Sequence, residues 1–124
     1  MPRPRQPGLT ENELEVMQVL WKNSSLKVAD IINLLNRNPK PAYTSMLTLV
    51  QSMEKKGYIK HQQLGRAFIY SPILKQEKFL FSEIKRISKR FFGGSPGKLV
   101  LNLVENEHLN SSELEELKKL LKDI

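Results

Sequence analysis

The chain has 124 residues and a mass of 14.4 kDa, enough for one hydrophobic core or two small ones but too short for a barrel enzyme or a doubly wound nucleotide-binding domain. Its 20 Lys and Arg against 13 Asp and Glu give a formal charge of +7, which favours nucleic acid or an anionic membrane surface as partner. The absence of cysteine excludes a disulfide scaffold, a thiolate metal site and a cysteine nucleophile. No run approaches the roughly 20 apolar residues of a membrane span, so we expect a cytoplasmic protein without membrane insertion.

Charge and helix-breaking residues divide the sequence. Residues 1–74 hold 10 basic and 5 acidic side chains, whereas residues 98–124 hold 4 and 6. Pro72 and the Gly93–Gly97 segment interrupt the helical patterns. We therefore expect a flexible basic arm over residues 1–8, a first domain over 9–73 and a helical domain over 74–124.

Three helices are predicted in the first half. Thr10 can cap the first helix, and Glu13 completes a capping box. Apolar residues at helical spacing predict that this helix ends near Asn23, that a second ends before Pro39, and that a third spans about residues 42–56. Their buried stripes are Leu14, Met17, Leu20 and Trp21; Val28, Ile31, Ile32 and Leu35; and Met46, Leu49, Val50 and Met53.

After Gly57 the apolar period changes from 3.6 to 2 residues. Residues 58–63 and 67–71 each read as a strand, and Gly65 in the connection predicts a hairpin. Two strands alone are marginally stable and must pack on the helices. The expected fold is mainly α with a small β-hairpin, a winged helix-turn-helix DNA-binding domain followed by a helical dimerisation domain. In a winged helix the third helix enters the major groove and the hairpin reaches the flanking DNA.

Short uncharged side chains cover the polar face of the third helix. Hydroxyl and amide groups can approach base edges and phosphates, and nearby cations add affinity that does not depend on sequence. Any solvated amphipathic helix shows such a face, and a solvated hairpin is the alternative for the wing; the order of the elements favours DNA. The expected contributors are Thr44, Ser45, Thr48, Gln51 and Ser52 on the helix, Lys60, His61 and Arg66 in the wing, and Lys40, Lys55 and Lys56 beside the helix.

The last third predicts helices over about residues 75–92 and 111–123, with an apolar stretch over 99–104 between them. Ser112 and Glu115 form a capping pattern for the last helix. So short a segment cannot bury this much apolar surface alone, which favours a two-fold dimer of interlocking chains. The expected dimer residues are Leu80, Ile84, Ile87, Leu101, Leu114, Leu117 and Leu121.

Nothing in the sequence indicates catalysis. His61 and His108 are the only histidines, and neither has a partner at metal-ligand spacing. The acidic residues Glu113, Glu115 and Glu116 are typical of a solvated helix face, in which Glu115 has Lys119 four residues on. Because no nucleophile elbow, phosphate-binding glycine loop or H-E-x-x-H motif occurs, we expect no enzyme activity, metal or cofactor.

Several stretches of the sequence, taken together, are specific enough to indicate a protein family. They are Leu9–Met17 with Leu20-Trp21, Ala42–Gln51 with Glu54–Gly57, Gly65–Tyr70, Phe92–Ser95, and Leu99–Leu103 before Leu114–Leu117. In their order and spacing the chain resembles the penicillinase-repressor family of the BlaI/MecI type over about residues 9–122. The resemblance implies a homodimeric transcriptional repressor that binds a palindromic operator. A non-sequence-specific DNA binder or a winged-helix protein-docking module stays open as an alternative; the neutral-to-basic third helix argues against docking.

The resemblance also implies where DNA and a regulator act. Family contacts come from the start of the third helix and from the wing, and the matching residues here are Thr44, Ser45, Thr48 and Arg66. Tyr43, where the best-known members have a different helix start, is a further expected DNA contact. The best-known members carry arginines where Leu47 and Ser52 stand, so the operator sequence is not implied. The cysteine motif of the copper-responsive relatives is absent, which excludes copper sensing by that route.

A membrane sensor protease triggers cleavage of those repressors between an asparagine and a phenylalanine. The matching bond here is Asn102–Leu103, in which leucine keeps the apolar character but not the ring. Cleavage at this bond is therefore a hypothesis. The alternative is that the two residues only pack in the dimer core.

Overall fold

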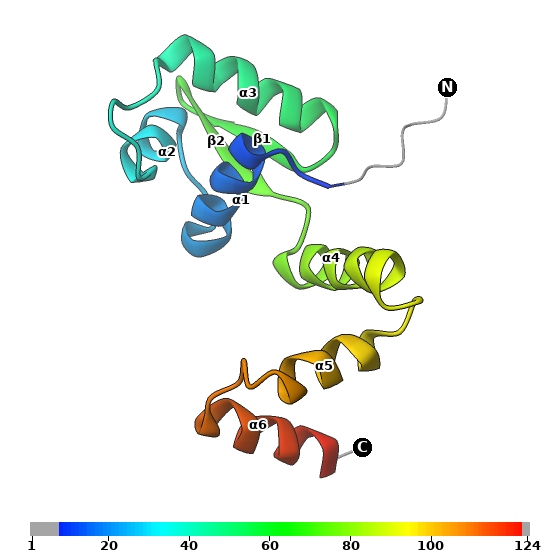
Figure 1. The fold of residues 1–124 in the computed structure, drawn as a ribbon. Coiled ribbons are helices and arrows are strands. Elements are labelled where there is room, and N and C mark those ends of the chain that lie inside the picture. The colour runs from blue at the N-terminus through cyan, green and yellow to red at the C-terminus, as the bar shows by residue number, and fades with distance from the viewer. Residues whose placement is uncertain (1–7, 123–124) are drawn as a thin grey trace. The chain divides into compact units, whose positions relative to one another are not determined.

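A computed structural model describes residues 8–122 of the chain, with side chains through residue 119, as two compact units divided after Leu80 (Figure 1). Residues 1–7, most of the expected basic arm, lie outside the described residues, as do the side chain of Leu121 and residues 123–124. The elements in chain order are α1 (Glu11–Asn23), α2 (Val28–Leu34), α3 (Tyr43–Lys55), β1 (Ile59–Leu64), β2 (Ala67–Pro72), α4 (Gln76–Phe91), α5 (Pro96–Glu105) and α6 (Ser111–Lys122). The fold is a winged helix followed by three further helices.

The helices of the first unit begin and end as their sequences dictate. The Thr10 side chain accepts a hydrogen bond from the Glu13 backbone N–H at 3.1 Å, and the Glu13 carboxylate accepts one from the Thr10 N–H at 2.9 Å. This is the predicted capping box, which satisfies two N–H groups that a helix start leaves unpaired. Gly57, with φ +87°, supplies the left-handed turn that follows α3.

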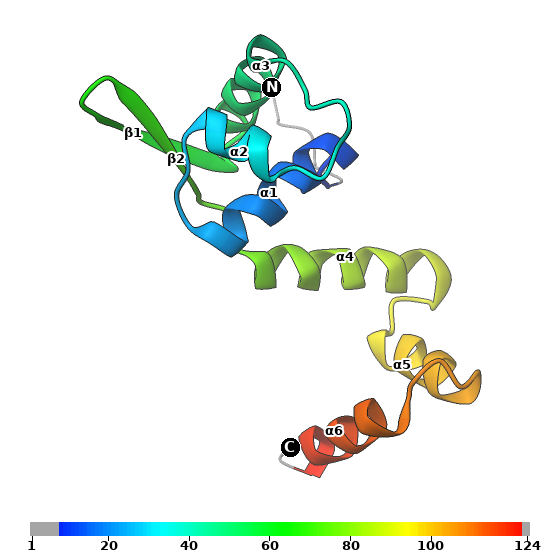
Figure 2. The ribbon, with the colours of Figure 1, turned by 90° about the vertical axis from the view of Figure 1, so that its left-hand side faces the viewer.

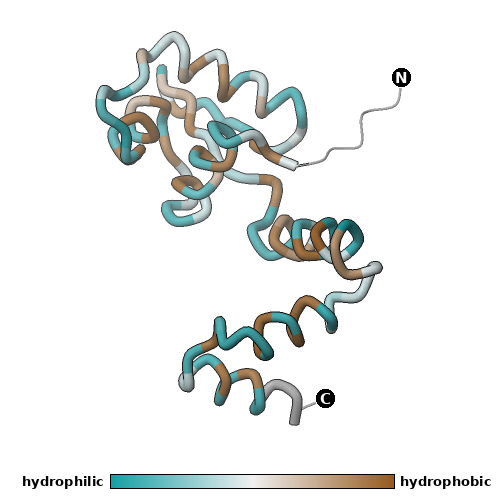
Figure 3. Tube along the Cα trace, in the orientation of Figure 1, coloured by the Kyte–Doolittle hydropathy of each residue, from teal (hydrophilic) through white to brown (hydrophobic). Residues whose placement is uncertain are grey.

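One core holds the first unit together. Burying each aliphatic side chain stabilises the fold by about 1.5–3 kcal/mol relative to leaving it in water. The predicted stripes of the first three helices supply most of the core. Figure 3 shows that hydrophobic and hydrophilic segments alternate along these helices. The buried apolar side chains are Val16, Met17, Leu20, Val28, Ile31, Leu35, Met46, Val50, Met53, Ile59 and Tyr70.

The wing is an antiparallel hairpin whose register runs from Ile59 opposite Pro72 to Leu64 opposite Ala67 (Figure 2). Gly65 at its tip has φ +64°. One feature has no counterpart in the sequence analysis: Leu26 exchanges both backbone hydrogen bonds with Tyr70, at 2.9 and 2.8 Å. This bridge ties the residues just before α2 to β2.

The division between the units falls inside α4, further along the chain than the expected boundary at residue 73. Trp21 explains the position. Its indole N–H donates to the Leu74 carbonyl at 2.8 Å, and its ring lies 5.9 Å from the Phe79 ring. The start of α4 therefore packs with the first unit.

Local caps set the helices of the second unit. The Ser95 side chain accepts from the Lys98 N–H at 3.2 Å at the start of α5. For α6 the expected cap is wrong: Asn110 and Glu113, rather than Ser112 and Glu115, form the reciprocal pair, at 2.8 and 3.1 Å. An Asn side chain caps as well as Ser, so both registers were compatible with the sequence.

The second unit has no apolar core of its own in its described part. Of the side chains over residues 81–119, only that of Ser88 is buried. Phe81, Phe91 and Leu101 are 60, 66 and 58% exposed. No helix within residues 8–122 is both long and apolar enough to cross a membrane.

Candidate nucleic-acid interface

α3 presents the predicted polar face to solvent. Its opposite face, with Met46, Val50 and Met53, is buried in the core, which fixes the rotation of the helix. The Thr48 hydroxyl donates to the Thr44 carbonyl at 3.0 Å, so the helix orients this side chain while its oxygen can still accept a hydrogen bond. The exposed residues of this face are Thr44, Ser45, Thr48, Gln51 and Lys55.

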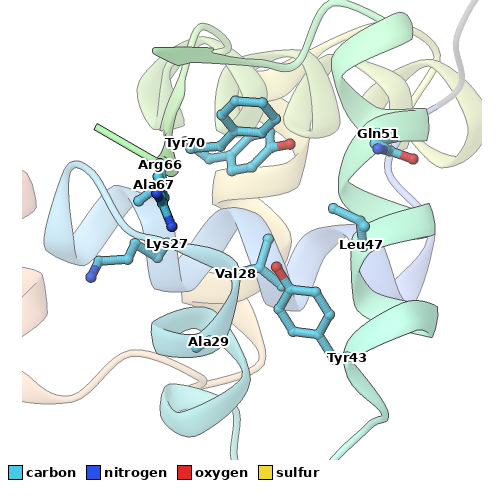
Figure 4. Close-up of a pocket in the computed structure, with 10 residues that line it drawn as sticks. Lys27, Val28, Ala29, Tyr43, Leu47, Gln51, Arg66, Ala67 and Tyr70 are labelled. Atoms are coloured by element: carbon cyan, nitrogen blue, oxygen red, sulfur yellow. The ribbon is translucent and has the colours of Figure 1, made fainter. Parts of the chain in front are cut away.

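A cleft of about 320 Å³ lies between α3, the residues that begin α2, and the wing (Figure 4). Leu47 and Gln51 of α3 line one side, and Lys27 and Arg66 lie across from them. Val28, Tyr43, Phe68 and Tyr70 also line the cleft and supply most of its apolar and aromatic surface. The cleft thus combines an apolar lining with two cations.

The cleft gathers some of the predicted site residues and not others. Tyr43 and Arg66 line it, whereas Thr44, Ser45, Thr48 and Lys55 lie along the exposed polar face of α3. Lys60 lines a separate hollow near Trp21 and Ser71. Its role as a DNA contact stays a prediction.

Sequence reasoning overlooked Lys27 as a site residue. It reaches the cleft because the Leu26–Tyr70 bridge draws the start of α2 against the wing. Its position directly before a short helix indicates only weakly that Lys27 belongs to the site, because nothing in the sequence indicates the Leu26–Tyr70 bridge. Lys27 and Arg66 form no ion pair among the described residues.

Two of the expected flanking cations are engaged within the fold. The Lys40 ammonium donates to the Asn33 carbonyl at 3.0 Å and also to the Leu35 carbonyl, at the end of α2. That of Lys56 lies 2.6 Å from the Glu13 carboxylate. Their ammonium groups therefore contribute to the fold, and their contribution to DNA affinity stays a prediction. Lys55, at the end of α3, is exposed and forms no ion pair among the described residues.

Two pKa shifts in this unit follow from burial and hydrogen bonds. Burial raises the pKa of Glu13, but hydrogen bonds from Lys56 and Thr10 outweigh burial and leave the pKa below its ordinary value. Burial also raises the pKa of Tyr70, and the nearby Glu54 and Tyr43 raise it further. Glu13 is thus ionised and the Tyr70 phenol is neutral at physiological pH.

The wing contacts α3 through a pair that the sequence analysis did not connect. His61 Nδ1 lies 2.8 Å from each carboxylate oxygen of Glu54. The imidazole ring also lies 4.7 Å from the Phe68 ring and 5.5 Å from the Tyr70 ring. His61 therefore contacts Glu54 of α3, and its expected role as a phosphate contact stays a prediction.

An exposed polar helix beside a cationic cleft and a hairpin defines a winged-helix DNA-binding protein. A family model described as penicillinase repressor matches residues 9–123. The penicillinase repressor of Bacillus licheniformis is 33% identical, with 94% of this chain and 91% of that protein aligned. The methicillin resistance regulatory protein MecI of Staphylococcus aureus (strain N315) is 26% identical, with 91% and 92% aligned.

A solved structure agrees with this likeness. The solution structure of the DNA-binding domain of the repressor BlaI superposes with a TM-score of 0.52 at 30% identity, covering 62% of this chain and 94% of that domain. The chain belongs to the penicillinase-repressor (BlaI/MecI) family. It is a DNA-binding transcriptional repressor and not an enzyme.

Proposed function

We propose that two copies of the chain bind an inverted-repeat operator in the cytoplasm and thereby repress transcription. The observation that carries this proposal is the exposed polar face of α3 beside a cleft flanked by Lys27 and Arg66. Base edges are read by short polar side chains in the major groove, and phosphates are bound by cations at its border. The interface offers both kinds of group.

Each residue of the interface has a distinct role in this proposal. Thr44, Ser45 and Thr48 meet base edges and nearby phosphates, and Lys55 meets a phosphate at the far end of α3. A sugar-phosphate strand runs along the cleft, where Lys27, Arg66 and the Tyr43 hydroxyl contact its phosphates. Leu47 and Phe68 then face the apolar deoxyribose edge.

Dimerisation is supported by the exposed apolar side chains of the C-terminal helices. A monomer would leave Ile84, Ile87 and Leu101 in water, at 39, 41 and 58% exposure, and Leu80 at 51%. Covering them with the same helices of a second copy removes this cost. Leu114 and Leu117 of the expected set are half-buried, and the side chain of Leu121, its last member, lies outside the described residues. A two-fold pair places its α3 helices about 34 Å apart, which requires an inverted repeat.

Regulation by cleavage at Asn102–Leu103 is the second part of the proposal. The Asn102 carbonyl accepts hydrogen bonds from the Asn106 N–H at 3.1 Å and from its side-chain amide at 2.9 Å, so the bond lies inside α5. Proteases prefer exposed, extended chain, and a cut here requires α5 to unwind. To test cleavage, the repressor is co-expressed with a sensor protease, the system is induced, and the mass of the repressor is then measured by mass spectrometry. An intact chain at a derepressed operator rules cleavage out.

Operator binding is tested by fluorescence anisotropy with a duplex from upstream of the chain's own gene and a shuffled duplex of equal composition. Specific binding predicts a preference on the order of a thousandfold at physiological salt. Equal, steeply salt-dependent binding to both would indicate a DNA-coating protein. A Thr48→Glu variant should lose the preference while remaining folded and dimeric, because residue 48 is exposed and far from the core stripe.

A further inference from the structure

An ion pair joins the wing to α3, beside the apolar packing that they share in the core. Glu54 stands in the last turn of α3, and His61 stands in β1, with Nδ1 2.8 Å from both carboxylate oxygens. Among residues 8–119 no other ion pair connects α3 to the hairpin. The side chains are 35% and 31% exposed, so solvent protons can reach them.

Few other titratable groups surround this pair. On α3, Tyr43 interacts electrostatically with Tyr70, and the exposed Lys55 directly follows Glu54 in the chain. On β2 the Tyr70 phenol stays neutral because burial raises its pKa. Lys60 precedes His61 on β1, and alternation along a strand puts it on the opposite face. The Glu54 carboxylate is therefore the charged group in direct contact with the His61 imidazole.

Protonation changes what the pair can do. Histidine is the side chain whose charge changes between about pH 5 and pH 8. An imidazolium forms an ion pair with Glu54 and is attracted to the aromatic faces beside it. A neutral imidazole retains only a hydrogen bond from Nδ1, and it leaves the Glu54 carboxylate uncompensated at the border of a DNA-binding surface.

We propose that Glu54 and His61 form a protonation-sensitive latch that positions the wing, and with it Arg66, against α3. His61 is a positioning residue in this proposal, which rests on the proposed operator binding. A loosened wing and an uncompensated carboxylate both weaken binding to a polyanion. Operator affinity therefore falls as pH rises from 6 to 8.

The first test measures operator affinity by anisotropy at pH 6, 7 and 8 and constant ionic strength. Partly exposed ion pairs change free energies by a few tenths to about 1 kcal/mol, so the wild type should lose roughly threefold per subunit. His61→Gln and Glu54→Gln should bind with no such pH dependence. His108→Gln, which alters the only other histidine, should follow the wild type. A wild-type profile in Glu54→Gln would make His61 a direct phosphate contact and overturn the latch.

The second test uses the free full-length chain and needs no DNA. Hydrogen–deuterium exchange of the hairpin amides, corrected for the intrinsic pH dependence, reports how often the wing opens. Opening should be more frequent at pH 8 than at pH 6 in the wild type and equal at both in His61→Gln. Equal opening in the wild type would overturn the latch whatever the DNA data show. A pH response without selective binding to any duplex would instead leave the latch in place and refute the operator proposal.

Discussion

The Lys56 ammonium lies 2.6 Å from the buried carboxylate of Glu13, which joins the end of α3 to the first turn of α1. The same carboxylate closes the Thr10 capping box with its other oxygen. A buried carboxylate is costly unless it is fully hydrogen-bonded, so this pair holds the end of α3 to α1.

Lys56→Met should therefore destabilise the first unit by about 1–3 kcal/mol, the cost of leaving a buried polar group without its partner. Lys55→Met is the matched control, because the neighbouring lysine is exposed and forms no ion pair among the described residues. Urea unfolding followed by Trp21 fluorescence measures both. Equal stability of the two variants would show that the pair contributes nothing.

The pKa of Glu13 predicts how this stabilisation depends on pH. Its pKa in the folded state lies below the ordinary value of 4.5, so the folded state favours the ionised form. Its contribution is complete above pH 4.5 and is lost as the pH falls through the folded-state value. Wild type and Glu13→Gln should thus differ most in unfolding free energy near pH 7 and converge in acid. A gap that widened on acidification would contradict the assignment.

Arg66→Ala and Lys27→Ala should weaken binding to operator and shuffled duplexes alike, because phosphate contacts carry no sequence information. Each should also reduce the slope of log affinity against log salt by about one. Lys40→Ala serves as the control, since its ammonium is held by carbonyls at the end of α2. A loss of selectivity in Lys27→Ala would instead assign that residue to base recognition.

Leu101→Glu should weaken dimerisation at least tenfold without unfolding the first unit. The side chain is 58% exposed in the single chain, so the substitution removes little packing within it but puts an unpaired charge into the proposed interface. Sedimentation equilibrium measures the dissociation constant, and Trp21 fluorescence reports the first unit. Lys98→Glu on the same helix, at an exposed position, is the control. An unchanged constant for Leu101→Glu would place the interface elsewhere.

Substitutions at two glycines should distinguish the cost of backbone strain from the cost of packing. A Cβ at Gly57 would meet no atom within 4 Å, yet φ is +87°, so Gly57→Ala should cost roughly 1–2 kcal/mol through conformation alone. Gly97 lies in the first turn of α5 without positive φ, and its nearest contact would be Ser95 Oγ at 3.6 Å. Gly97→Ala should be neutral or stabilising by up to about 1 kcal/mol. Thermal unfolding of both variants checks the opposite signs.

The winged-helix fold was predictable because its determinants are local. Met46, Val50 and Met53 recur at the helical period, and the alternation around Gly65 marks the hairpin. The exposure of Thr44 and Thr48 followed directly, since the opposite face of an amphipathic helix must be solvated. Local sequence alone gave the wrong cap for α6, because Asn110 and Ser112 are both good capping residues and only the fold selects between them.

The remaining features depend on contacts between elements. Lys27 enters the site through the Leu26–Tyr70 bridge, and neither residue signals that pairing in the sequence. The carbonyl and carboxylate acceptors of Lys40 and Lys56, and the Glu54 carboxylate beside His61, were likewise not predictable from the sequence. Side-chain partners of this kind are set by tertiary packing, which periodicity does not encode.

If repression requires the proposed dimer, the exposed apolar surface of the C-terminal helices makes repression depend on the amount of protein in the cell. When most copies are single, the number of pairs rises with the square of the total, so halving the supply removes about three quarters of the pairs. An operator served only by pairs would consequently be released after modest dilution, such as one round of cell growth without new synthesis. The rate at which the chain is degraded would then set how long repression lasts, besides removing the protein.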